Sequence, residues 1–230
     1  MIANRSALAP LSLVTNRKQV ALCLAQCMLL SLCALAEEAT IISFDPPGSR
    51  QTIPISINTG GSVTGYYRDG NTIHGFLRAP DGSFTAIDAP GSTFTNPLSI
   101  NPAGWIAGYF LGSQMFHGFL RAPDGDIITF DPPGSTETMP QSINSAGVVT
   151  GFYAANGTFH GFLRDPDGTV TSFDPSGSTS TWPSSINSGG EITGSYVDSG
   201  QLYHGFVRAP DGTFTTFLVQ PGQYTQPASN

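Results

Sequence analysis

Four histidines are the residues of this sequence that most invite a chemical role. Each begins a pentapeptide His-Gly-Phe-Leu/Val-Arg, and these recur at intervals of 43, 43 and 44 residues: His74, His117, His160 and His204. A ring of imidazoles around one axis would bind a metal ion. The repeat instead places each histidine on the third strand of its unit, away from any axis. We therefore expect structural imidazoles that are hydrogen-bonded to backbone or to aspartate. We expect no metal and no cofactor.

Four arginines end the same pentapeptides, and they are Arg78, Arg121, Arg164 and Arg208. An aspartate follows later in each of the first three units (Asp88, Asp131 and Asp174), and Asp45 precedes the first unit. A converging ring of arginines would bind carboxylates, but repetition alone does not make side chains converge. We expect these arginines to form structural pairs with the aspartates, within or between units.

The sequence contains no motif that is typical of a catalytic site. A Gly-x-Ser-x-Gly motif is absent, and most acidic residues belong to repeated turns. Two acidic residues outside the repeated motifs, Glu137 and Asp198, support an alternative hypothesis of an extracellular polysaccharide hydrolase or lyase. A non-catalytic binding module is the hypothesis we prefer, and a purely structural surface protein is the third.

The repeat predicts the elements that position these residues. Each unit contains Ser-Ile-Asn, an Asn-x-x-Gly turn, a β-branched and aromatic stretch, the histidine pentapeptide and a Pro-Asp-Gly turn. Such a unit of four short strands, three tight turns and one long connection is typical of a propeller blade. We predict an all-β propeller of four blades of about 43 residues. The alternatives are a β-solenoid and an open or five-bladed arrangement.

The motif Ile-Asn-x-x-Gly-x-x-x-Gly, followed by His-small-Phe-Leu, resembles the extracellular HAF-type repeat of bacterial secreted proteins over residues 41–217. Here every unit has His-Gly-Phe, and Val207 replaces leucine in the last. The strand plan is also similar to kelch blades, although the kelch double glycine is absent. The resemblance implies an exported repeat protein and no particular activity.

Residues 1–36 have the pattern of a secretory signal peptide. Basic residues precede an apolar run that ends in Ala34-Leu35-Ala36, and an uncleaved anchor is the alternative. Cleavage would remove all three cysteines and would leave six arginines, no lysine and sixteen acidic residues. An acidic, exported chain argues against nucleic-acid and anionic-membrane partners. We expect a repeat domain over 37–219, a tail over 220–230, and a secreted, extracellular or periplasmic location.

Variable segments indicate where a ligand would bind. The connections between units, and those between the second and third strands, differ from unit to unit and should share one face of the propeller. A glycan or a protein is the expected ligand. The tentative binding residues are Arg50, Tyr67, Arg68, Phe110, Tyr153, Trp182 and Tyr196.

The fourth-strand pattern occurs five times, one more than the other strands. The additional copy is Ile41-Ile42-Ser43-Phe44-Asp45, and the last copy has Leu218 where the others have aspartate. Because ring closure commonly combines strands from both chain ends, we expect residues 41–45 to form a strand beside the last blade, either replacing or flanking residues 213–217.

Overall fold

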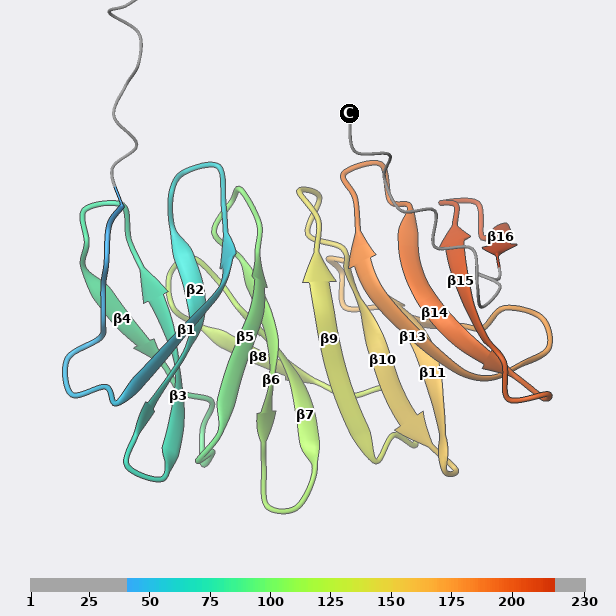
Figure 1. The fold of residues 1–230 in the computed structure, drawn as a ribbon, viewed down its shortest axis with the longest axis horizontal. Coiled ribbons are helices and arrows are strands. Elements are labelled where there is room, and N and C mark those ends of the chain that lie inside the picture. Colours follow the sequence, from blue (N-terminus) through green and yellow to red (C-terminus); the bar gives the residue numbers. More distant parts are fainter. Residues whose placement is uncertain (1–40, 218–230) are drawn as a thin grey trace, which may run out of the picture. The chain divides into compact units, whose positions relative to one another are not determined.

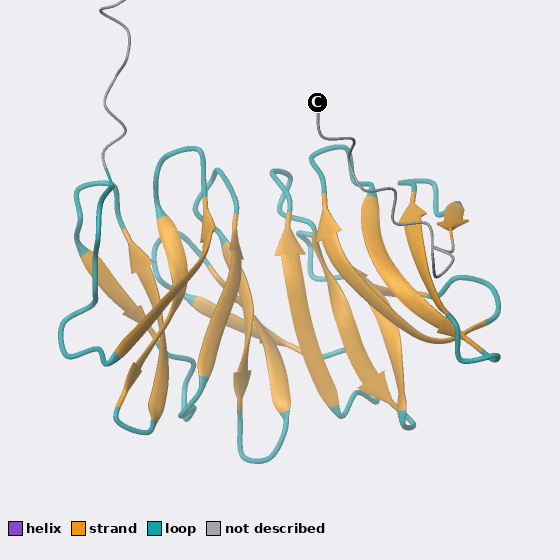
Figure 2. Ribbon diagram, viewed as in Figure 1, coloured by secondary structure: helices purple, strands orange, loops and turns teal. Residues whose placement is uncertain are grey.

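The computed structural model describes residues 41–217, and every regular element in this range is a β-strand (Figure 2). The described residues include no helix that could span a membrane. The strands are β1 Gln51–Ile57, β2 Val63–Asp69, β3 Thr72–Arg78, β4 Phe84–Ile87, β5 Thr95–Ile100, β6 Ile106–Leu111, β7 Phe116–Arg121, β8 Ile127–Phe130, β9 Glu137–Ile143, β10 Val149–Ala155, β11 Thr158–Arg164, β12 Val170–Phe173, β13 Ser178–Ile186, β14 Ile192–Asp198, β15 Tyr203–Arg208 and β16 Phe214–Phe217.

These strands form four antiparallel sheets of four, each a meander in chain order: β1–β4, β5–β8, β9–β12 and β13–β16 (Figure 1). The predicted propeller blades are confirmed. Asn-x-x-Gly turns and Pro-Asp-Gly turns lie next to each other at one end of every sheet, which we call the turn end. The variable connections lie at the opposite end, which we call the loop end.

Local chemistry accounts for the turns. Gly82 has a φ of 91° and its counterparts Gly125, Gly168 and Gly212 have similar values, a region that only glycine adopts without strain. In the first of these turns the Asp81 carboxylate accepts a hydrogen bond from the backbone N–H of Ser83 at 2.9 Å. Turn geometry is therefore set by a few residues within each repeat.

A proline in the first strand of each sheet fits an edge position, where the missing N–H breaks no ladder. In the third sheet this residue is Pro140, which pairs with Gly151 of β10, and the register shifts next to it. A Cβ on Gly151 would overlap the carbonyl oxygen of Met139. The repeat thus needs glycine at this point of its second strand.

The core lies between neighbouring sheets. Four phenylalanines of the third strands are fully buried, and they are Phe76, Phe119, Phe162 and Phe206. The sheets pack in chain order, with β2 against β5, β6 against β9 and β10 against β13. Among the described strands, none of the first sheet makes sustained contact with one of the fourth.

The expected strand at 41–45 is wrong. Residues 41–46 have no strand conformation, and β16 pairs along β15 at the outer edge of the fourth sheet. The strand that pairs with β15 is therefore β16 and not residues 41–45. The expected signal peptide at 1–36 and the expected tail at 220–230 lie outside the described residues.

Candidate functional site

The four histidines bind aspartates and do not gather around a common point. In the first three sheets the imidazole Nδ1 contacts the aspartate that follows the fourth strand, at 2.9 Å (His74–Asp88), 2.7 Å (His117–Asp131) and 2.8 Å (His160–Asp174). In the fourth sheet His204 Nε2 contacts Asp198 at 2.8 Å. No group of three or more potential metal ligands occurs within residues 41–217.

The expected pairing of those aspartates with arginine is wrong, and the register of the hairpin explains why. Gly75 pairs with Ile87 and Arg78 pairs with Phe84, so Asp88 lies next to His74 at the other end of strand β3 from Arg78. The arginines instead donate from Nη1 to the carbonyl oxygen of the next residue, at 3.1 Å for Arg121.

The arginines also help to join the sheets. The guanidinium of Arg164 lies over the Phe130 ring of the preceding sheet, 5.0 Å from its centre, and Arg208 lies over Phe173 at 4.9 Å. Burial lowers the pKa of Arg164, and the charge of Asp167 opposes this. The geometry is that of a buried cation–π contact, which gives these arginines a structural role.

The two acidic residues of the alternative enzyme hypothesis lie on different sheets. Asp198 accepts hydrogen bonds from the backbone N–H groups of Gly200 and Leu202, at 2.8 and 3.0 Å, as well as contacting His204. The bond from Leu202 is the largest of the causes that lower the Asp198 pKa. A carboxylate held ionised in this way stabilises its loop and is a poor general acid. Glu137 is the first residue of β9, on a different sheet.

Four of the tentative binding residues stack on the histidines and help to fill the space between sheets. The ring of Tyr67 lies 5.1 Å from His74, and the counterparts Phe110, Tyr153 and Tyr196 make the same contact with His117, His160 and His204. Phe110, Tyr153 and Tyr196 are at most 9% exposed. The structure thus buries these three residues, whereas Tyr67 is partly exposed.

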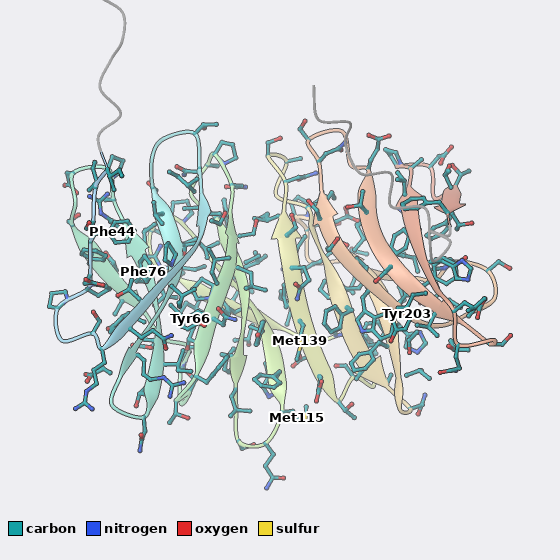
Figure 3. All side chains as sticks on the ribbon, viewed as in Figure 1. Phe44, Tyr66, Phe76, Met115, Met139 and Tyr203 are labelled. Atoms are coloured by element: carbon teal, nitrogen blue, oxygen red, sulfur yellow. The ribbon has the colours of Figure 1, made fainter. Side chains whose placement is uncertain are left out.

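Trp182 lies in a different environment, within a group of aromatic side chains near the loop end. Its ring lies 5.6 Å from Phe159 and 6.3 Å from Tyr203, and Phe159 packs edge-on against Phe152 at 5.6 Å. We call these four residues the aromatic patch. It joins the third and fourth sheets, and Tyr203 is 69% exposed. Figure 3 shows Tyr203 on β15, with Met115 marking a hairpin tip at the loop end.

A smaller group in the second sheet repeats this arrangement. Tyr109 packs against Phe94 at 5.9 Å and edge-on against Phe116 at 5.3 Å, and its hydroxyl accepts a hydrogen bond from Asn96 Nδ2 at 3.0 Å. Sequence reasoning missed these residues and most of the aromatic patch. The alternation of side chains along a strand was the available signal, because it places neighbouring aromatic residues on opposite faces of the sheet.

Arg50 and Arg68 are both exposed at the loop end of the first sheet. The backbone N–H of Arg50 donates to the carbonyl oxygen of Arg68 at 2.8 Å, which continues the pairing of β1 with β2. They belong to the first sheet, so the structure does not bring these two arginines together with the aromatic patch.

A cavity of about 270 Å³ lies at the turn end, between the second and third sheets. Trp105, Leu120 and Ile128 line it from one sheet, and Arg164 and Pro166 line it from the other. The cavity is on the end of the sheets opposite the variable connections, and its volume is small for a ligand pocket. Trp105 distinguishes it, because the counterparts of this residue are Ser62, Val148 and Glu191.

No protein-family profile matches this sequence, and no curated protein matches it. Similar solved structures include TolB from Acinetobacter baumannii (TM-score 0.58, 12% identity, covering 73% of this chain and 43% of that one). Virginiamycin B lyase from Staphylococcus aureus is similar with a TM-score of 0.53 and 16% identity, covering 81% of this chain and 62% of the lyase. A puromycin hydrolase matches with a TM-score of 0.59 and 12% identity, covering 81% and 31%.

The chain therefore spans less than two thirds of each of these proteins. At such low identity the likeness concerns the fold alone, and it agrees with the four meander sheets and their turn chemistry. The described part of the chain has the β-propeller fold.

Proposed function

We propose that this protein is an exported, non-catalytic binding module that recognises a glycan through the aromatic patch. The observation that carries the proposal is the group of Phe152, Phe159, Trp182 and Tyr203, half-buried to exposed, on a rigid frame next to variable loops. Aromatic faces at a partly exposed surface suit the apolar faces of sugar rings. The scarcity of charged side chains in the patch favours a neutral ligand over an ionic one.

Export rests on the sequence of residues 1–36 and on the resemblance to HAF-type repeats. The expected first residue of the exported protein is Glu37. N-terminal sequencing of protein recovered outside the cytoplasm would test this, and an intact Met1 or cleavage at another site would contradict it.

A glycan array followed by titration calorimetry tests the binding site. Tyr203→Ala removes a ring that is 69% exposed and should leave the fold intact. We expect it to weaken binding roughly tenfold, which corresponds to about 1.4 kcal/mol. Trp182→Ala should weaken binding at least as much.

Ile128→Ala is the matched control, because Ile128 is 43% exposed on β8, a strand with no residue in the patch. It should bind as the unmodified chain does. Binding that is unchanged in Tyr203→Ala and Trp182→Ala would remove the patch from consideration. If the chain binds no glycan but binds a protein through Tyr203, the ligand is a protein and the proposed ligand class is wrong.

A further inference from the structure

The first strands of the sheets show that one sheet lacks a neighbour. The isoleucine that ends this strand is 6% exposed in the second, third and fourth sheets, at Ile100, Ile143 and Ile186. In the first sheet the same position, Ile57, is 67% exposed. The difference arises because each later sheet packs against the sheet before it, and no sheet of the described chain precedes the first. We call the surface around Ile57 the leading face.

The fourth sheet has the opposite deficiency. Phe173 ends the fourth strand of the third sheet, is 8% exposed, and packs in one cluster with Ile186, Ile192 and Phe206 of the fourth sheet. Its counterpart Phe217 is 50% exposed, because no sheet of the described residues follows. We call the surface around Phe217 the trailing face. The apolar residues of the trailing and leading faces are therefore the two halves of an interface that occurs three times inside the chain.

Two hydrogen bonds between sheets also recur at every internal junction. At the last internal junction Asn144 Nδ2 donates to the carbonyl oxygen of Asn187 at 3.3 Å, and the N–H of Ile186 donates to Ser142 Oγ at 3.3 Å. The same two bonds join the first sheet to the second and the second to the third.

The first and fourth sheets each carry one donor and one acceptor of this junction that have no neighbouring sheet to bond among the described residues. The trailing face carries Ser185, which is exposed, and Asn187, whose Nδ2 turns back to Glu191 Oε2 at 2.7 Å. The leading face carries the N–H of Ile57 and the carbonyl oxygen of Asn58 at the equivalent positions. A donor and an acceptor on one face thus match an acceptor and a donor on the other.

We propose that the trailing face of one molecule binds the leading face of a second copy of this chain, head to tail, and repeats the internal junction. The occupant is a second copy because each molecule carries both halves of one interface, and the described residues do not bring the two halves together. Such a contact is heterologous, since different surfaces of the two molecules meet. It does not depend on the proposed glycan site.

Sedimentation velocity and light scattering on the purified full chain, over a wide range of concentration, test this. The unmodified chain should reach at least twice the mass of the monomer. Ile57→Asp and Phe217→Asp each place a carboxylate on one face, at positions exposed enough to leave the fold intact, and each should remain monomeric. Thr129→Asp is the matched control, because Thr129 is exposed on β8 of the second sheet, and this variant should associate as the unmodified chain does.

A mixture of the two variants gives the decisive result. Ile57→Asp keeps a sound trailing face and Phe217→Asp keeps a sound leading face, so an equimolar mixture should regain a heterodimer. A mixture that stays monomeric would exclude head-to-tail pairing. A monomeric unmodified chain at all concentrations would overturn the proposal, and association that survives both single substitutions would do the same.

Discussion

The asparagine that joins neighbouring sheets gives the sharpest test of how the blades are held together. Asn144 is 5% exposed, and its side chain makes three hydrogen bonds. Its Oδ1 accepts from the backbone N–H groups of Ala146 and Val148, both at 3.0 Å, and its Nδ2 donates to the carbonyl oxygen of Asn187 at 3.3 Å. One side chain therefore fixes its own turn and also attaches the third sheet to the fourth.

Asn144→Ala should lower the free energy of unfolding by about 2–4 kcal/mol. Each lost hydrogen bond contributes about 0.5–1.5 kcal/mol, and buried partners without a replacement add to the loss. Asn187→Ala is the matched control at the same repeat position. The side chain of Asn187 is exposed and, among the described residues, bonds only within its own turn, to Glu191. Water can therefore replace this side chain, and the expected loss is about 1 kcal/mol or less.

Asn144→Asp separates the two roles of the side chain. The carboxylate keeps both acceptor bonds within the turn but has no donor for the carbonyl oxygen of Asn187, so the loss of about 1–3 kcal/mol should come from the junction. Urea unfolding of dilute protein, followed by circular dichroism, measures all three values. If Asn144→Ala costs no more than Asn187→Ala, the asparagine bonds do not hold the sheets together.

Two further predictions concern the backbone of the repeat. Gly151→Ala would bring a Cβ into the carbonyl oxygen of Met139 and should destabilise the chain by about 1–3 kcal/mol or more, whereas Gly134→Ala, with no atom within 4 Å of the new Cβ, should cost only the roughly 1 kcal/mol of its left-handed backbone; urea midpoints compare them. Acid should destabilise the fold, because a carboxyl with a lowered pKa stabilises it above the usual aspartate value of about 3.9 and loses this contribution as the pH falls through the lowered pKa. Backbone hydrogen bonds are the main cause of the lowered pKa at the aspartates of three Pro-Asp-Gly turns, Asp81, Asp167 and Asp211. Once these three are replaced by asparagine, the free energies of unfolding at about pH 5 and pH 3 should differ less than in the unmodified chain. An unchanged difference would refute this.

The four-stranded sheets could be predicted from the sequence because their turns are locally determined. Gly82 needs its positive φ, and Asp81 caps the turn through the Ser83 N–H, whatever the rest of the molecule does. The alternation of side chains along each strand and the length of the repeat then predict four antiparallel strands in chain order. Residues 41–45 show the limit of this reasoning, because they carry the residue pattern of the fourth strands and yet have no strand conformation.

The side-chain partners were harder to predict, because they depend on register. His74 and Arg78 lie on one strand, and only the pairing of Gly75 with Ile87 decides that Asp88 reaches the histidine. The surroundings of the aromatic residues were hard to predict for a related reason. Phe152 and Tyr153 are adjacent, and alternation assigns them to opposite faces, but the sequence does not say which face a neighbouring sheet covers.

Whether a neighbouring sheet covers a face also decides whether a residue of a repeat protein belongs to the scaffold or to the surface. Identical motifs acquire different roles according to whether another sheet lies against them, as the exposures of Ile143 (6%) and Ile57 (67%) show. A motif that recurs in every unit therefore serves the scaffold, either within a blade or at the junction between blades. The positions that can carry recognition are those where the units differ and no sheet covers the side chain, and Tyr203 satisfies both conditions. The exposed residues that still conform to the repeat, Ile57 and Phe217, stand at the positions that form the internal junctions, and this match is the basis of the proposed head-to-tail contact.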